Sequence, residues 1–441
     1  MSKAQILSAQ EALNQTQGRV LLVNPPVIDR RYPWVRWNQP LDLLKLGTVL
    51  SKTHGCEVKL FDFMLPTPKG VVPRRQSPIE SNLSSDSPTR WQYGRSWKEF
   101  DAYLDDLAGS KWIPDSVWVT TLTSFWWQMV PLVANRVKNK LKRPTVVLYG
   151  NYPVLETAHA AQFCPNVDIV VKDHADLTHW PADFSLYKGH KLRFCALDLR
   201  SPDPLGEIAQ ALERGTSHFC FFNDNLFEDF DTRLKPILEE VVNQNWDLRF
   251  HGLCGVQIRD FPVDHAQLLA NAHFNALHFE LAVNADGIVD EPLYRAVMQA
   301  CERAGFASRR GGGWDSLNHR NLSGFLWIGK PDDDLEKLVW NALKLVQLVG
   351  MVIPKPYSPT PGSEDYALLE SQVDWLEPED ISPHRLPFAG RNGIEESDYE
   401  DFYRMTGFLN RRVRSHTFDF LGDTYLAKVI RQSLAGRRWA I

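Results

Sequence analysis

The middle of the chain reads Lys191-Leu192-Arg193-Phe194-Cys195-Ala196-Leu197-Asp198, a run that predicts a buried strand ending in a carboxylate. A loop with Pro202 and Pro204 follows, and a helix is expected to continue to about Arg214. Residues 218–222 then predict a second buried strand. A strand–helix–strand unit of this kind predicts parallel strands, with a ligand site at their carboxyl ends.

The same alternation continues to the end of this half, residues 187–366. Further strands are expected at 247–253, 276–281, 324–328 and 351–356, with helices at 231–244, 263–272, 290–304 and 333–349. Six or so such units predict a partial (β/α)6 TIM-type barrel with its site at the carboxyl ends of the strands. A helical C-terminal region, basic at its end, is expected over 367–441.

The first half, residues 1–186, shows a second set of alternating elements. Strands are expected at 19–24, 58–61, 116–122, 145–149 and 167–171, and helices at 41–53, 129–142 and 155–163. This pattern predicts a doubly wound, Rossmann-like parallel sheet, so the whole chain is of the α/β class. Residues 64–112 are rich in Pro, Ser, Arg and Trp, and predict an irregular insertion, either a surface loop or a lid.

Composition excludes several classes of protein. A length of 441 residues predicts two or three domains, and a net charge of -5 argues against nucleic acid as a partner. No apolar run approaches the ~20 residues that a membrane helix needs, so no membrane span is expected. Six cysteines without a C-x-x-C pair argue against a zinc site or a disulfide framework and favour a cytoplasmic location.

Short motifs in both halves resemble the B12-binding (cobalamin-dependent) radical SAM family of the class B type. In the first half the resemblance is carried by Val20-Leu21-Leu22-Val23-Asn24-Pro25-Pro26, Thr123-Ser124 and Val146-Val147-Leu148-Tyr149-Gly150. In the second half it is carried by Phe222-Asn223-Asp224-Asn225-Leu226-Phe227, Glu280, Gly324-Phe325-Leu326-Trp327-Ile328-Gly329-Lys330-Pro331 and Pro356-Tyr357-Ser358-Pro359-Thr360-Pro361-Gly362-Ser363. The resemblance implies a cobalamin-binding domain followed by a radical-SAM-like partial barrel.

The cluster motif of that family, C-x-x-x-C-x-x-C, has no counterpart in this chain. The loop 198–204, which follows the first strand of the second half, contains no cysteine. Iron–sulfur clusters need several thiolates converging on one locus. We therefore expect no iron–sulfur cluster and no reductive cleavage of S-adenosylmethionine, while binding of S-adenosylmethionine itself stays open.

Cobalamin is the cofactor that the resemblance implies, at the carboxyl ends of the first-half strands. No histidine follows the first strand, so the lower face of the corrin is expected to be open or to be covered by a side chain such as that of Tyr32, Trp34, Trp126 or Trp127. Alternatively, the two tryptophans pack under the next helix, and Thr123 and Ser124 either bind the nucleotide tail or cap that helix. The expected cofactor-binding residues are Asn24, Pro25, Tyr32, Thr123, Ser124, Trp126, Trp127, Gly150, Asn151 and Asp173.

Four residues are candidates for catalysis in the second half. Asp224 and Glu280 lie at strand ends, where they are expected to bind S-adenosylmethionine or a substrate amine, to bind nothing, or to act as a general acid and base. His251 and His319 are candidates for proton transfer, or are structural histidines.

These expectations combine into two functions. The first is a cobalamin-dependent transferase, expected to move a methyl group to a small-molecule substrate by non-radical chemistry. The second is a non-catalytic cobalamin-binding accessory, carrier or sensor protein, with a partner enzyme or a second copy of this chain as its partner.

Overall fold

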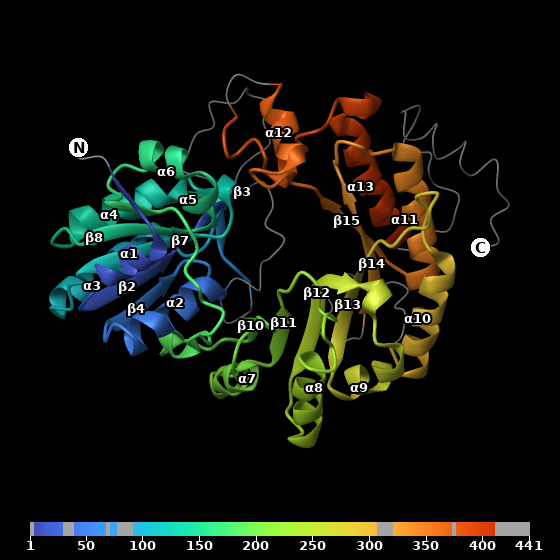
Figure 1. The fold of residues 1–441 in the computed structure, drawn as a ribbon, viewed down its shortest axis with the longest axis horizontal. Helices are drawn as coiled ribbons and strands as arrows, with labels where there is room; N and C mark the ends of the chain where they lie inside the picture. The colour runs from blue at the N-terminus through green and yellow to red at the C-terminus, as the bar shows by residue number, and fades with distance from the viewer. Residues whose placement is uncertain are drawn as a thin grey trace. The chain divides into compact units, whose positions relative to one another are not determined.

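The computed structural model describes residues 4–29, 39–67, 71–76, 91–306, 321–372 and 376–410 (Figure 1). It is a mixed α/β fold with parallel sheets, which confirms the predicted class. The chain divides into two compact units: unit 1 is Met1–Ser217 with Thr360–His384, and unit 2 is His218–Pro359 with Arg385–Ile441. Within the described residues, no helix is long and apolar enough to span a bilayer.

Unit 1 is built on six parallel strands in the order β1-β9-β8-β7-β2-β4. The strands are β1 (Gln5–Leu7), β2 (Arg19–Asn24), β4 (Glu57–Asp62), β7 (Ser116–Thr121), β8 (Thr145–Gly150) and β9 (Ile169–Val171). The helices are α1 (Ala9–Asn14), α2 (Leu41–Lys52), α3 (Trp97–Gly109), α4 (Met129–Lys140), α5 (Asn151–Leu155), α6 (Thr157–Phe163), α7 (Pro204–Glu213) and α12 (Glu364–Glu370). Strand β10 (Phe194–Leu197) precedes α7.

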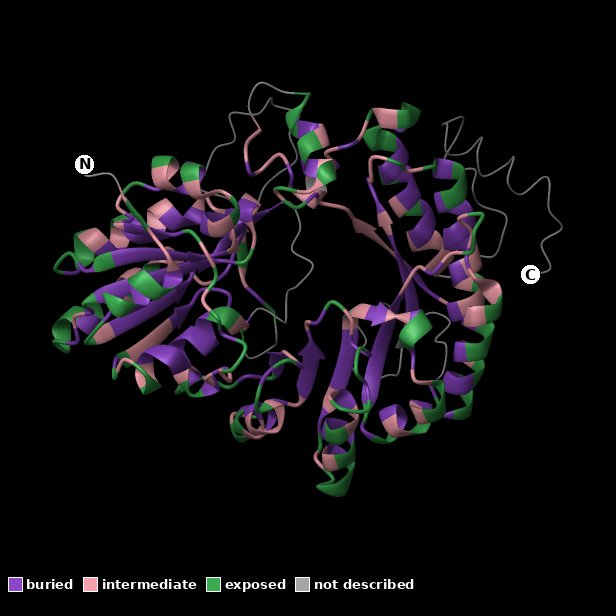
Figure 2. Cartoon of the chain, viewed as in Figure 1, coloured by how far each residue is buried: buried purple, intermediate pink, exposed green. Residues whose placement is uncertain are grey.

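Helices cover both faces of this sheet because successive side chains of a strand point to opposite sides. Val20 and Leu22 belong to a core cluster with apolar residues of α1 and α2. Leu21 and Val23 belong to a second cluster, with residues of α3, α4 and α6. The central strands are accordingly buried on both faces, as Figure 2 shows.

The expected irregular insertion, 64–112, contains regular structure, and the prediction is wrong for its second half. Helix α3 begins with a capping box in which the Ser96 hydroxyl accepts from the Glu99 amide and the Glu99 carboxylate accepts from the Ser96 amide. Phe100, Leu104 and Leu107 then bury one face of the helix in the core. Before it, β3 (Val27–Asp29), β5 (Arg74–Gln76) and β6 (Trp91–Tyr93) form a small antiparallel sheet.

Unit 2 contains five parallel strands that lie side by side in chain order. They are β11 (His218–Phe221), β12 (Arg249–Gln257), β13 (Phe274–Glu280), β14 (Asn321–Ile328) and β15 (Val352–Pro356). The helices are α8 (Leu234–Asn243), α9 (Ala266–Asn271), α10 (Glu291–Arg303), α11 (Leu335–Val349) and α13 (Glu396–Asn410). The strands and connecting helices were thus all predicted in the second half, with ends that differ by a few residues.

One face of the unit 2 sheet carries polar side chains. A Cβ on Gly324 would lie 2.7 Å from Leu345 of α11, so Gly324 faces that helix. Ser323, Phe325 and Trp327 therefore point to the other side, which we call the inner face. The strand register places further residues on it: His251, His278, Glu280 and Lys355.

The unit boundary differs from the expected division at residues 186 and 187, because β10 and α7 are fastened to unit 1. The side-chain amide of Gln39 donates to the Phe194 carbonyl and its oxygen accepts from the Ala196 amide, both at 2.9 Å. The expected separate region 367–441 is also divided. Its residues up to His384 belong to unit 1, and those from Arg385 belong to unit 2. In unit 2 the Asn410 side chain accepts from the Val352 amide and donates to the Val352 carbonyl, which links α13 to β15.

Candidate functional site

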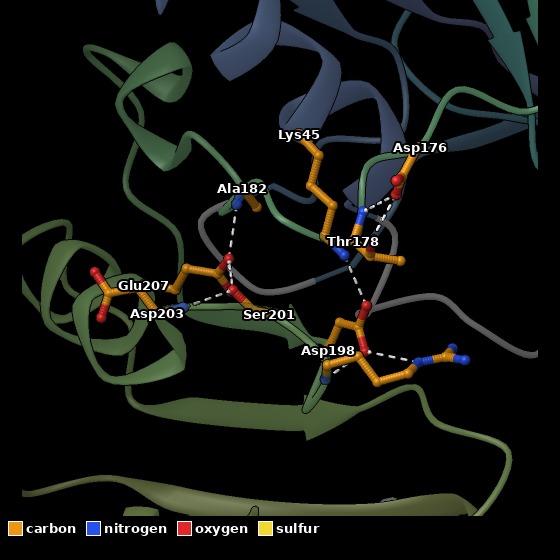
Figure 3. A network of polar contacts seen from close by, with 9 residues as sticks. Lys45, Asp176, Thr178, Ala182, Asp198, Ser201, Asp203 and Glu207 are labelled. Carbon is orange, nitrogen blue, oxygen red and sulfur yellow. Dashed lines mark hydrogen bonds and ion pairs between the residues drawn. The ribbon is translucent and has the colours of Figure 1, made fainter.

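The loop that follows β10 is held by a buried ion pair (Figure 3). The ammonium of Lys45, on α2, lies 2.7 Å from Oδ2 of Asp198, and their side chains are 6% and 15% exposed. The other oxygen, Oδ1, accepts from the Arg200 amide at 2.9 Å. Both charges are largely removed from water, and their mutual attraction offsets part of the cost of burying them.

Glu207, in the first turn of α7, links the same loop to Ala182, which precedes β10 in the chain. Its Oε1 accepts from the Ser201 hydroxyl at 2.7 Å and from the Ala182 amide at 2.6 Å. Burial raises the pKa of Glu207, against the lowering effects of these two hydrogen bonds and of Lys45. Its Oε2 is buried without a partner among the described residues, which favours a proton on this carboxyl.

The cysteines near this loop are packed as apolar residues. Cys195 lies inside β10, its thiol donates to the Ala196 carbonyl at 3.3 Å, and burial raises its pKa well above the usual value. A thiolate ligand needs the opposite shift. Within the described part of the chain, no group of three or more His, Cys, Asp or Glu residues is arranged to hold a metal ion. In place of a cysteine motif, the loop carries a network of carboxylates that fastens it.

At the carboxyl ends of β2 and β4 in unit 1, Asn24 and Asp62 meet. Oδ1 of Asp62 accepts from the Asn24 side chain and from the Met64 amide, both at 2.8 Å. Oδ2 accepts from the Tyr187 hydroxyl at 2.7 Å. Burial raises the pKa of Asp62 to about 6, although all three hydrogen bonds lower it. Asn24, an expected cofactor residue, is thus engaged in a structural contact.

The Asp62 carboxyl predicts a dependence of stability on pH. A carboxyl whose pKa rises on folding stabilises the fold fully below its unfolded pKa of 3.8, and this stabilisation is lost as pH rises through the folded value of about 6. A tenfold change in a protonation equilibrium corresponds to about 1.4 kcal/mol, so the loss of stability across this window is about 3 kcal/mol.

The test compares wild type with Asp62→Asn by urea unfolding between pH 4 and pH 7. We expect the free-energy difference between the two proteins to change by about 3 kcal/mol, with wild type relatively more stable at the acidic end. Asp106→Asn, at an exposed position on α3, is the matched control. Parallel pH profiles for wild type and Asp62→Asn would contradict the assignment.

Buried hydroxyls gather at the carboxyl end of β7. Oγ1 of Thr121 and Oγ1 of Thr123 are both buried and have no hydrogen-bond partner among the described residues. Thr123 precedes a 3-10 turn, Ser124–Trp126, but its side chain makes no capping bond there. Buried hydroxyls are normally satisfied, so these two leave bonding capacity for a ligand or water.

Gly150, at the end of the neighbouring strand β8, has a backbone that other residues rarely adopt. Its φ is 108°, and a Cβ would lie 2.6 Å from Oγ1 of Thr120 and 2.9 Å from the Thr121 carbonyl. The next residue, Asn151, donates from its side chain to the Leu122 carbonyl at 2.7 Å. The two strand ends are thereby held against each other.

The remaining expected cofactor residues lie in packing or in other contacts. The Trp126 indole is 7% exposed and donates to Asp29 at 3.0 Å, and Trp127 stacks on Tyr152 in the core. Pro25 and Ser124 are buried, and Asp173 accepts from the Ala9 amide at the start of α1 at 2.6 Å. Tyr32 lies outside the described residues. Trp127 packs against the core cluster that includes α4, as in one of the two alternatives. Trp126 instead packs with Val27, Met64, Val72 and Tyr93.

In unit 2, Glu280 lies at the end of β13 between two donors. Oε2 accepts from the Gln257 side chain, at the end of β12, at 2.5 Å. Oε1 accepts from the Trp327 indole, near the end of β14, at 2.8 Å. Each oxygen is thus held from one neighbouring strand, which fixes the carboxylate at the edge of the sheet.

Neither Asp224 nor His251, the two other expected catalytic residues that the structure describes, is bonded to Glu280. Asp224 is exposed after β11, and His319 lies outside the described residues. His251 is buried within β12, where its Nε2 lies 3.0 Å from Nδ1 of His218. This pair was not predicted. The two histidines are brought together only by the register of β11 and β12, and no spacing in the sequence indicates that register.

Two further inner-face residues were missed by the sequence reasoning. Lys355 donates to the Leu253 carbonyl at 3.0 Å, and its ammonium lies 3.5 Å from the centre of the Phe325 ring. His278 is buried, and desolvation, followed by the charge of Lys355, lowers its pKa to about 3. The neutral imidazole of His278 is therefore part of the core. For Lys355, the sequence signal that could have been used is a lysine within an otherwise apolar strand.

Comparisons with known proteins identify no family for this chain. No protein-family model matches the chain, and no curated protein matches its sequence. Among solved structures, native arginase from Bacillus caldovelox at pH 5.6 is similar at a TM-score of 0.18 and 13% identity, covering 67% of this chain and 99% of the arginase. A likeness at this level carries no argument about function.

Proposed function

We propose that this protein binds cobalamin and transfers a methyl group to a small molecule by polar, non-radical chemistry. In this proposal unit 1 is the cobalamin-binding unit, and unit 2 is an incomplete β/α barrel that holds the substrate at the carboxyl ends of its strands. The observation that carries the proposal is the pair of unsatisfied buried hydroxyls, Thr121 and Thr123, at the carboxyl end of a doubly wound sheet. Ligands of such sheets bind at that edge.

The residues of unit 1 fit a corrinoid in part. Thr121 and Thr123 each have an unused bonding capacity that an amide or phosphate group of the ligand would satisfy. Trp126 and Trp127 are committed to Asp29 and to Tyr152, so we do not assign them to the cofactor. Bound cobalamin would supply a cobalt centre able to carry a methyl group and release it to a nucleophile.

The loop after β10 supports chemistry without a radical initiator. Its side chains are Asp198, Ser201 and, from α7, Glu207, and they bond to Lys45 and to one another. These side chains are bonded to protein groups, whereas iron–sulfur clusters take thiolates, which this loop lacks. In unit 2, Glu280 is the described carboxylate placed to accept a proton from the group that becomes methylated.

Binding of cobalamin is tested by the visible spectrum of the protein after incubation with hydroxocobalamin and gel filtration. We expect a retained corrin band, and a three- to tenfold rise in Kd for Thr123→Val, since one lost hydrogen bond is worth about 0.5–1.5 kcal/mol. Thr145→Val, at an exposed position at the opposite end of β8, should bind as wild type does. A folded wild-type protein that retains no corrin would refute the cofactor assignment.

Transfer is tested separately, by the loss of methylcobalamin absorbance in the presence of thiol, amine and hydroxyl acceptors. Consumption with one acceptor class supports the transferase. Retained cobalamin without consumption of methylcobalamin would instead assign the protein to the accessory, carrier or sensor class.

A further inference from the structure

The Glu280 carboxylate has no cationic partner within the part of the chain that the structure describes. Its two oxygens accept from Gln257 and Trp327, which are both neutral. Among the described residues, no lysine, arginine or histidine forms an ion pair with it, whereas Lys45 pairs with Asp198. A half-buried carboxylate held in place by neutral donors receives no opposite charge from them and retains lone pairs for a ligand.

Two cations near the same edge, Arg259 and Lys355, have other partners. Arg259 donates to the Val283 carbonyl at 2.8 Å and lies 3.4 Å from Asp290. Lys355 donates to the Leu253 carbonyl and lies against the Phe325 ring. Neither is available to neutralise Glu280 without losing these contacts.

We propose that Glu280 binds a protonated amine, and that the methyl acceptor is a small monoamine, whose nitrogen must give one proton to Glu280 so that its lone pair is free to take the methyl group. The second part rests on the proposed function, and the first stands on the geometry alone. An ammonium group has several donors, and the carboxylate has about four acceptor positions, of which Gln257 and Trp327 use two. The fixed oxygens therefore select an ammonium over a neutral hydroxyl of the same size.

The position of Lys355 narrows the class of amine. It lies on the inner face two strands from Glu280, which is about 10 Å across the sheet. A second ammonium on the ligand would meet the charge of Lys355 and be disfavoured. We therefore expect diamines to bind more weakly than monoamines, whereas a simple amine and an amino acid present the same ammonium group to Glu280.

The test is a ligand-observed saturation-transfer titration with propylamine and 2-phenylethylamine against their neutral analogues propanol and 2-phenylethanol. Putrescine represents the diamines, and phenylalanine represents the amino acids. We expect at least one amine to bind wild type tenfold or more tightly than its alcohol, and tighter than putrescine. Binding of phenylalanine would identify amino acids as the source of the ammonium.

Three variants assign the effect to Glu280. Glu280→Gln should lose tenfold or more of the amine affinity, and Glu302→Gln, at an exposed position on α10, should lose none. Gln257→Leu keeps the carboxylate but frees one oxygen, and should show an intermediate loss. If Glu280→Gln does not fold, as judged by its circular dichroism melt, Glu280→Asp serves instead and should retain the preference for amines with weaker binding.

The outcomes separate this inference from the proposed function. Equal binding of amines and alcohols, no amine binding by wild type, or unchanged amine binding by a folded Glu280→Gln variant would overturn the inference. The corrin band is recorded on the same samples and should be unaffected by Glu280→Gln. Amine binding without any corrin band would refute the proposed function and leave the ammonium site standing.

Discussion

Lys45→Met should destabilise the protein by about 3–5 kcal/mol, the usual cost of removing one partner from a buried ion pair. The Asp198 carboxylate would stay buried at 15% exposure without its cation. Arg200 lies 3.5 Å away, but its side chain is 55% exposed and offers little compensation. Loss of the lysine would also remove a charge that lowers the pKa of Glu207, so the network would be weakened at a second carboxyl.

The measurement is equilibrium urea unfolding, followed by tryptophan fluorescence and circular dichroism. Lys140→Met is the matched control, because Lys140 and Asp105 pair at the surface with side chains 38% and 59% exposed, and its cost should stay below about 1 kcal/mol. The double variant Lys45→Met with Asp198→Leu should recover part of the loss, since both charges are then gone. If Lys45→Met costs no more than Lys140→Met, the ion pair does not fasten the loop.

The second large effect is expected at Gly150. Gly150→Ala forces a side chain into a backbone conformation at φ 108°, where the new Cβ would lie 2.6 Å from Thr120 and 2.9 Å from a carbonyl oxygen. Backbone strain and overpacking each cost about 1–3 kcal/mol, so a total of about 2–6 kcal/mol is expected. The new Cβ would displace the end of β7, which carries Thr121 and is followed by Thr123. We therefore expect the affinity for cobalamin to fall together with the stability.

Gly189→Ala provides the control for backbone strain alone. Gly189 also has a positive φ, of 83°, but a Cβ there meets no atom within 4 Å. Its cost should be limited to about 1–2 kcal/mol of conformational strain. The difference between the two variants in urea unfolding measures the close approach of the strand ends at Gly150. Equal losses for the two glycines would show that this approach is not tight.

Much of the fold was predictable because parallel strands are long apolar runs separated by helices. Val20 to Val23 and the strand before Asp198 were recognised in this way. Helix α3 was not recognised, although Ser96 and Glu99 form a capping box at its start, because the surrounding sequence is rich in tryptophan and arginine and was interpreted as irregular. Strand β1 was also missed, because three residues at a sheet edge carry too little pattern.

The candidate site was predictable only residue by residue. Glu280 follows from its place at the end of a strand, but Gln257 and Trp327 reach it from β12 and β14. These contacts depend on the register of β12, β13 and β14. The pattern of apolar residues does not determine which residues lie opposite each other at the ends of the strands.

The sequence by itself determined the α/β class, most of the strands and the absence of cysteines from the loop that follows Phe194 to Leu197. These properties are local, because each rests on residue types within a few positions of one another. Only the tertiary structure decided what occupies that loop: Lys45 reaches Asp198 across 153 positions of the chain, and Glu207 folds back to Ala182. Such contacts follow from how α2 and α7 pack, and the burial that makes them strong exists only in the folded protein.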